Sequence, residues 1–242
     1  FFSSGAALPP QTKTLPSNRL LLSQSLRRDL IAFSPDIILY IPRSAATPMS
    51  ILRARMLKLQ ARGCPVAIIS LQRRRYPRPL IWLVSQLKPD LLLVLSTKSQ
   101  SIASSLNCPI GMIPLGVDID RFRPPQHDEK MRLRSLYGIG GRKVVLHVGH
   151  LNPRRNINLL LGIPTDDVSL VIVSSTTTKS DKELRNSLRR HGVIFLDTYI
   201  EKIEEIYRLA DCYVFPTHSE KGAIEIPLSL LEAMATNLPV VT

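Results

Sequence analysis

Short apolar runs of strand length alternate with helical patterns along most of the chain, and this alternation constrains the fold more than any other feature. The apolar runs leave no polar face, so both faces of each strand must be buried. Such strands, separated by helices, are typical of parallel sheets covered on both sides. The strands are predicted at 36–41, 65–70, 91–95, 110–113, 144–149, 168–173, 193–196, 212–215 and 239–241. Helices are predicted at 49–62, 79–87, 98–106, 180–190, 201–210 and 227–236, with one more starting near Arg155.

The segment from Ile113 to Pro125 divides the alternation into two halves because it is rich in turn-forming residues. The predicted fold class is α/β, with two Rossmann-like domains built on parallel sheets. The first domain spans 1–116 and the second 143–242, and residues 117–142 supply the linker and an opening helix. The chain lacks a starting Met and stops inside a predicted strand, so we expect a fragment open at both ends, with both domains incomplete.

The positive charge is concentrated in the first half of the chain. Residues 1–116 contain 15 Lys/Arg and 3 Asp/Glu, whereas residues 117–242 contain 17 and 16. A region of one sign usually meets a partner of the other sign, here nucleic acid, an anionic membrane surface or an anionic substrate. A solvated basic surface without a dedicated partner is the alternative. Only 5% of the residues are aromatic, so the basic residues lack the interleaved stacking platforms of nucleic-acid binders, and we expect no nucleic-acid partner.

We expect residues 1–116 to contact an anionic membrane surface instead. The predicted contacts are Arg73, Arg74, Arg75 and Arg78, with Tyr76 and Trp82 as interfacial anchors. No apolar run approaches the ~18–20 residues that span a bilayer. The scattered Cys64, Cys108 and Cys212 form neither a disulfide framework nor a zinc spacing, and we interpret them as buried thiols. These features favour a cytoplasmic protein, peripheral at the inner face of the membrane.

Residues that follow the strands of the second half are the first candidates for a site, because ligands of such sheets lie beyond the carboxyl ends of the strands. Gly149 ends the strand 144–149, His150 follows it, and Arg154 and Arg155 come at the next turn. The glycine allows close backbone approach, and the planar guanidinium of arginine suits phosphate. An anion-binding turn and a solvated basic turn both fit this segment.

The segment after the strand 212–215 leads into the helix 227–236. Pro227 fits the first helical position, and Leu228 and Ser229 follow it, so the backbone N–H groups there suit a phosphate. Glu232 lies one to two turns into this largely apolar helix, where it can accept hydrogen bonds from ribose hydroxyls. Glu225 precedes the helix, where it can face a sugar. The alternative is a helix with ordinary exposed carboxylates.

Two stretches resemble the family-4 glycosyltransferases of the GT-B fold, also called glycosyl transferases group 1. One is Ile113-Pro114-Leu115-Gly116-Val117-Asp118 with Phe122 and Pro124, which resembles the interdomain signature of that family. The other runs from Tyr207 through Pro216 to Leu231-Glu232-Ala233-Met234-Ala235 and Pro239-Val240-Val241. The segment from Gly149 to Arg155 is similar to the part of the family that holds the donor diphosphate. The resemblance covers the chain from about residue 36 to its end.

The resemblance implies a metal-independent hexosyltransferase without a cofactor. It would move a sugar from a nucleotide diphosphate sugar to a glycan or lipid-linked acceptor, with retention at the anomeric carbon. The family then implies that Arg155 stabilises the leaving diphosphate and that Glu225 faces the donor sugar, so these two are the predicted catalytic residues. Glu232 would hold the ribose. Gly149, His150, Leu228 and Ser229 complete the predicted substrate contacts, and no metal ligand is expected.

The spacing of the two glutamates departs from the family pattern. Six residues separate Glu225 from Glu232, whereas the family has seven, and Ile224 occupies the expected position. Residues 1–116 also contain no histidine, while many members place one near the donor sugar. Two alternatives therefore stay open: a non-catalytic module of the same fold that binds a nucleotide sugar or a polyanion, and a GT-B nucleotide-sugar epimerase.

Overall fold

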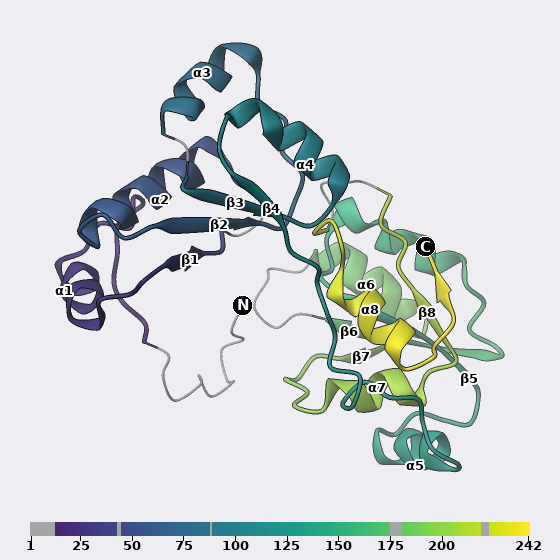
Figure 1. Ribbon diagram of the computed structural model, residues 1–242. Helices are drawn as coiled ribbons and strands as arrows, with labels where there is room; N and C mark the ends of the chain where they lie inside the picture. The colour runs from purple at the N-terminus through teal and green to yellow at the C-terminus, as the bar shows by residue number, and fades with distance from the viewer. Residues whose placement is uncertain (1–12, 43–44, 88, 175–180, 219–222) are drawn as a thin grey trace. The chain divides into compact units, whose positions relative to one another are not determined.

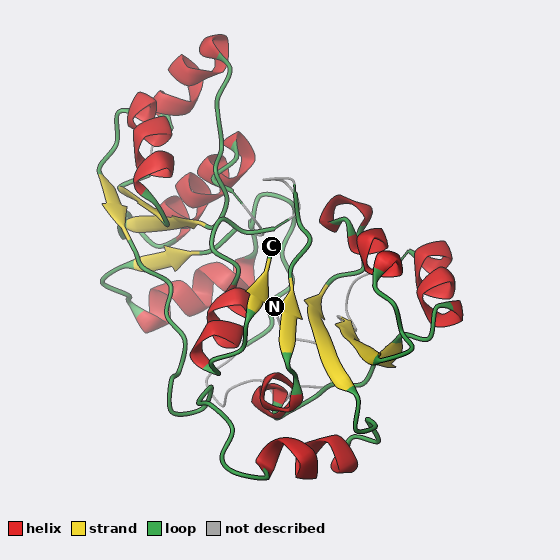
Figure 2. Ribbon diagram, turned by 90° about the vertical axis from the view of Figure 1, so that its right-hand side faces the viewer, coloured by secondary structure: helices red, strands yellow, loops and turns green. Residues whose placement is uncertain are grey.

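The computed structural model describes residues 13–42, 45–87, 89–174, 181–218 and 223–242, and these form two compact units (Figure 1). The N-terminal unit runs to Leu115 and also includes Ile224–Ile226. The C-terminal unit consists of Gly116–Ala223 and Pro227–Thr242. Each unit has its own sheet of parallel strands (Figure 2). The predicted α/β fold with two parallel sheets is confirmed.

The sheet of the N-terminal unit has four parallel strands in the order β1-β2-β3-β4. An unpredicted helix, α1 (Gln24–Phe33), precedes the sheet and begins at a Ser23 cap. The apolar side chains of α2 pack on β2 and β3, with Ile51, Ile68 and Leu92 almost fully buried. The elements are β1 (Ile38–Tyr40), α2 (Pro48–Gln60), β2 (Val66–Ser70), α3 (Arg78–Gln86), β3 (Leu91–Val94), α4 (Thr97–Ala103) and β4 (Ile110–Met112).

Side-chain caps fix where the helices of this unit begin. Thr47 accepts a hydrogen bond from the backbone N–H of Ser50 at 3.1 Å, and Pro48 occupies the first turn of α2. Ser96 caps α4 through the N–H of Ser99 at 3.2 Å. Both caps follow the carboxyl end of a strand, so they fix the loops at that edge of the sheet.

The sheet of the C-terminal unit has five parallel strands in the order β7-β6-β5-β8-β9. The chain builds outward from β5 through β6 to β7, then crosses to the other side of β5 for β8 and β9. The strand order therefore reverses between β5 and β8, and ligands of such sheets bind beyond the carboxyl ends at this switch point. The strands are β5 (Lys143–Gly149), β6 (Val168–Ser174), β7 (Ile194–Leu196), β8 (Cys212–Val214) and β9 (Val240–Val241).

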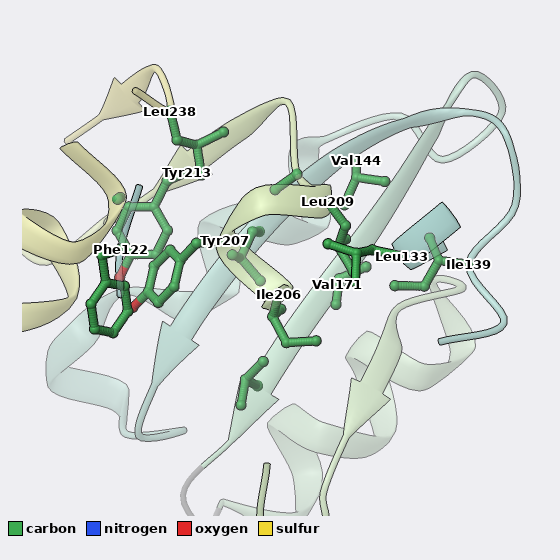
Figure 3. Packing of buried hydrophobic residues seen from close by; sticks show 14 of the residues in the cluster. Phe122, Leu133, Ile139, Val144, Val171, Ile206, Tyr207, Leu209, Tyr213 and Leu238 are labelled. Carbon is green, nitrogen blue, oxygen red and sulfur yellow. The ribbon is translucent and has the colours of Figure 1, made fainter. Parts of the chain in front are cut away.

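Alternate side chains of β6 enter two different apolar clusters, one on each face of the sheet. Val171 and Val173 join the larger cluster with side chains of α5, α7 and α8, whereas Leu170 and Ile172 pack against α6 and the segment before β6. Figure 3 shows the aromatic part of the larger cluster, where the ring of Tyr207 lies 5.8 Å from Phe122 and 5.9 Å from Tyr213 between centroids. The helices are α5 (Glu129–Leu136), α6 (Lys182–Arg190), α7 (Ile203–Leu209) and α8 (Leu228–Ala235).

The helix predicted near Arg155 is wrong. Two short 3-10 segments, Pro153–Arg155 and Ile157–Gly162, occupy this stretch, and Asn156 lies between them with a left-handed φ of 52°. A left-handed residue cannot continue an α-helix, so the chain turns again instead of extending. Pro227 is likewise the extended residue before α8, with ψ at 124°, and not its first helical residue. The three cysteines are half-buried, not buried, and form no disulfide.

Closely spaced ion pairs join the segments at the amino ends of the strands. Glu129 is 8% exposed at its side chain and accepts hydrogen bonds from Arg123 at 3.0 Å, from Arg208 and from the backbone N–H of Gln126 at 2.9 Å. Burial alone would raise the pKa of Glu129, but these donors outweigh it and lower the pKa to about 2. Glu129 therefore ties α5 to the linker and to α7.

Replacing this carboxylate tests how much the C-terminal unit depends on it. We expect Glu129→Gln to lower the free energy of unfolding by about 3 kcal/mol at pH 7, because two arginines lose their counter-charge. A folded pKa below the ordinary value stabilises the fold above the ordinary value, and this contribution disappears as the pH falls from about 4.5 to about 2. Urea unfolding measured across this pH range should show the gap between wild type and variant closing. Exposed Glu201 provides the matched control, and a Glu201→Gln effect of the same size would contradict the assignment.

Candidate functional site

The carboxyl end of β5 is built for close approach of another group to the backbone. A Cβ atom added at Gly149 would overlap the guanidinium of Arg155 and lie 3.2 Å from Nε2 of His147. The Arg155 side chain thus occupies the space beside Gly149 and would have to shift if this residue carried a side chain. The structure thus brings the candidate residues Gly149 and Arg155 close together.

Arg155 is half-buried beside the end of β8. Its guanidinium carbon lies 5.9 Å from the ring centroid of Phe215, the residue that follows β8. Burial lowers the pKa of Arg155, and burial together with the charge of Arg155 lowers the pKa of half-buried His150. A cation that loses part of its hydration at a switch point is suited to an anionic ligand.

The start of α8 contacts the same region through Tyr213 in β8. The hydroxyl groups of Tyr213 and Ser229 are hydrogen bonded, and the Tyr213 hydroxyl donates to the carbonyl of Val148 at 3.2 Å. Among the described residues, no side chain caps α8, so its first backbone N–H groups, those of Leu228 and Ser229, can bind an anion. Residues 219–222 of the segment that leads into this helix lie outside the described residues.

Glu232 projects from α8 toward the buried Tyr207 of α7. The Tyr207 hydroxyl donates to Oε2 of Glu232 at 2.6 Å. Burial raises the pKa of Glu232 and outweighs the opposing effects of this hydrogen bond and of the charge of Arg121. The electrostatic surroundings of Tyr213 include both Glu232 and Arg155. Arg155 and Glu232 therefore both lie near enough to Tyr213 to influence its pKa, in opposite directions.

Glu225 lies with the N-terminal unit. Its carboxylate accepts hydrogen bonds from Ser99 at 2.6 Å, from Arg73 at 2.9 Å and from Ser96, and its backbone N–H donates to the carbonyl of Leu71 at 2.9 Å. Burial opposes ionisation, but these donors outweigh it and lower the pKa of Glu225. The structure thus groups Arg155, Gly149, His150, Ser229 and Glu232 in one unit and places Glu225 in the other.

The predicted membrane contacts after β2 divide into two groups. Arg74 and Arg75 are exposed, and Trp82 is 70% exposed. The prediction that Tyr76 is an interfacial anchor is wrong, because Tyr76 packs against the core and its hydroxyl donates to the carbonyl of Ala46. Arg73 is not available either, because it binds Glu225. The side chain of Arg78 lies outside the described residues.

Sequence reasoning missed the two tyrosines and gave His147 no role in the site. Tyr207 and Tyr213 belong to a motif and a strand that the sequence identified, but no local pattern gave either residue a role of its own. Among the described residues, no group of three His, Cys, Asp or Glu side chains is arranged to hold a metal ion. Within the same ranges, no helix is both long enough and apolar enough to cross a bilayer.

Comparisons with known proteins show which proteins the chain resembles in sequence and in fold. Residues 142–242 match the family model of glycosyl transferases group 1. The chain is 29% identical over 143 residues to the GDP-mannose-dependent alpha-(1-6)-phosphatidylinositol monomannoside mannosyltransferase of Mycolicibacterium smegmatis, a match that covers 53% of the chain and 37% of that protein. It is 27% identical over 129 residues to the sulfoquinovosyl transferase of Arabidopsis thaliana, which covers 52% of the chain and 24% of that protein.

The fold is also shared with a solved structure. Anabaena HepE in complex with UDP and glucose superposes with a TM-score of 0.67 at 18% identity, over 90% of this chain and 62% of that one. The matches to the mannosyltransferase and to the sulfoquinovosyl transferase each span well under half of the length of those proteins. The resemblance to group 1 glycosyltransferases of the GT-B fold is confirmed by these comparisons.

Proposed function

We propose that the chain is the core of a retaining glycosyltransferase that moves a sugar from a nucleotide diphosphate sugar to a glycan or lipid-linked acceptor. The observation that carries the proposal is the half-buried Arg155 guanidinium over Gly149 at the β5–β8 switch point. A cation held there, beside the start of α8, matches the needs of a diphosphate. The transferred sugar would be a hexose, as the family resemblance implies.

The chemistry assigned to this edge of the sheet is stabilisation of a leaving group. When the bond between the sugar and the diphosphate breaks, negative charge develops on the diphosphate oxygens. Arg155 and the first N–H groups of α8, those of Leu228 and Ser229, would stabilise that charge from fixed positions. In this proposal the protein's own donors do this work, and no metal ion or cofactor is required.

Glu232 is the proposed ribose contact. Its raised pKa reflects a carboxylate that has lost hydration and has not recovered it from ion pairing. Hydroxyl groups of a ribose would supply the missing donors. Buried Tyr207 would keep one carboxylate oxygen in place while the ribose binds to the other.

Glu225 is the proposed contact to the donor sugar, and its present partners favour a second candidate function. Its side chain is 8% exposed and is bound by Arg73, Ser96 and Ser99. A carboxylate with that many donors suits a non-catalytic nucleotide-sugar module of the same fold. Release of nucleotide diphosphate from UDP- and GDP-sugars, with and without acceptor, separates the two: turnover excludes the module.

A lipid-linked acceptor would bring the protein to the inner face of a membrane, within the cytoplasm. Two observations support this part of the proposal. The Mycolicibacterium relative is named for a phosphatidylinositol monomannoside. The N-terminal unit also presents exposed Arg74, Arg75 and Trp82.

Replacing Arg155 tests the diphosphate contact directly. We expect Arg155→Ala to weaken UDP or GDP binding by about 1.5–3 kcal/mol, which is the typical contribution of a charged hydrogen bond. Arg154→Ala is the matched control, because Arg154 precedes Arg155 in the sequence and its side chain is exposed. This variant should change the affinity for UDP or GDP less than twofold. Calorimetry in EDTA measures both. A folded wild-type chain that binds neither nucleotide would refute the proposal.

Replacing Glu232 and replacing Glu225 should have different effects on the affinity for free nucleotide. Glu232→Gln is expected to weaken UDP or GDP about 10-fold or more, because a charged acceptor is lost, without lowering stability, because burial already disfavours that charge. Glu225→Gln should leave free-nucleotide affinity unchanged and lower turnover. Calorimetry and thermal unfolding of both variants check this. Equal losses of nucleotide affinity would contradict the two roles.

Charge reversal tests the membrane contact. Arg74→Glu with Arg75→Glu should lower partitioning onto vesicles containing anionic lipid roughly 30-fold or more, at about 1 kcal/mol for each arginine lost. Lys182→Glu with Arg190→Glu changes the charge equally on the C-terminal unit and should have little effect. Vesicle sedimentation at low and high salt measures both pairs. Wild-type binding that is insensitive to salt, or equal on neutral vesicles, would overturn the electrostatic contact.

A further inference from the structure

His147 is a buried histidine at the carboxyl end of β5, and packing alone does not account for it. It is 0% exposed, and its ring stacks at 15° on Tyr213 with 6.4 Å between centroids. Phe215 lies at the same centroid distance. A phenylalanine would fill this aromatic position equally well, so the two ring nitrogens need their own explanation.

The hydrogen bond at Nδ1 determines the tautomer. Nδ1 lies 2.9 Å from the carbonyl oxygen of Val214. A carbonyl oxygen only accepts, so Nδ1 carries the proton and Nε2 presents a lone pair. Burial lowers the pKa of His147 to about 4, with a smaller contribution from the charge of Arg155, so the ring is neutral at physiological pH. Nε2 is therefore a permanent acceptor.

That acceptor has no hydrogen-bond partner among the described residues, although it is buried. Buried acceptors without a donor are rare and call for an explanation. Nε2 would lie 3.2 Å from a Cβ at Gly149, and the same Cβ would overlap the Arg155 guanidinium. The lone pair and the guanidinium thus converge on the space that glycine leaves open.

We propose that His147 is a positioning residue for Arg155: its Nε2 accepts an N–H from the guanidinium when a diphosphate binds, which directs the remaining N–H groups toward the phosphate oxygens. The planar guanidinium has donors on more than one edge, so one edge can bind Nε2 while another binds the ligand. The ring itself, fixed by Val214 and by its two aromatic neighbours, cannot turn away. This inference rests on the proposed nucleotide-diphosphate site.

Variants of the full chain, titrated with UDP, GDP and the matching nucleosides, separate positioning from packing. His147→Leu should lower diphosphate affinity about tenfold and leave nucleoside affinity unchanged. His147→Gln, whose amide oxygen can take the place of Nε2, should restore most of the loss. In an Arg155→Ala background, His147→Leu should add less than a twofold effect, because the group that it positions is absent.

Three results would overturn the inference: equal losses for nucleoside and diphosphate, no rescue by His147→Gln, or a full additional loss in the Arg155→Ala background. A wild-type chain that binds no diphosphate would refute the proposed function as well, whereas wild-type binding that His147→Leu leaves intact refutes only the role of His147. Nitrogen NMR of the wild-type imidazole needs no variant to fold. The Nε2 resonance should move on addition of UDP while Nδ1 stays protonated, and an unmoved Nε2 contradicts the proposal.

Discussion

Burial of β5 between two neighbouring strands, with apolar clusters on both faces of the sheet, is the constraint on which the candidate site depends. Interior strands surrounded in this way carry mostly apolar side chains, so the polar groups of the site gather at or near the end of the strand, where His147 also lies. Gly149 is the last residue of β5, and the absence of its side chain admits Arg155. Because β6 and β8 leave β5 in opposite directions, the loops that follow them diverge and leave space for a ligand.

The two edges of the C-terminal sheet have opposite effects on the charged forms of the side chains that lie there. At the amino ends, Glu129 and Asp211 are surrounded by arginines, a lysine and backbone N–H groups, which lower the pKa of both carboxylates. At the carboxyl ends, burial raises the pKa of Glu232 and lowers that of Arg155. At the amino ends, ion pairs join segments of the unit. At the carboxyl ends, burial disfavours the charged forms of Glu232 and Arg155, and a bound ligand of suitable charge and hydrogen bonding would stabilise those forms.

The basic N-terminal unit shows how tertiary contacts change the use of a charged run. Arg73, Arg74 and Arg75 are consecutive, yet Arg73 binds Glu225 while the other two are exposed. Tyr76 likewise belongs to the core, where burial raises its pKa to about 12. A run of like charges therefore overstates the number of side chains available to an outside partner.

The sequence by itself determined the strands, the parallel sheets and the placing of Gly149 and Arg155 at and after the end of a strand, because each depends on local periodicity or on the rule that sites follow parallel strands. Tertiary structure decided the rest. The turn at Asn156 replaced a helix, Tyr207 came to Glu232 from another helix, and Glu225 joined the N-terminal unit. The unpaired lone pair of His147 also depends on a carbonyl 67 residues away. Local patterns carry no information about such partners, because only the packing of distant segments determines which donor meets which acceptor.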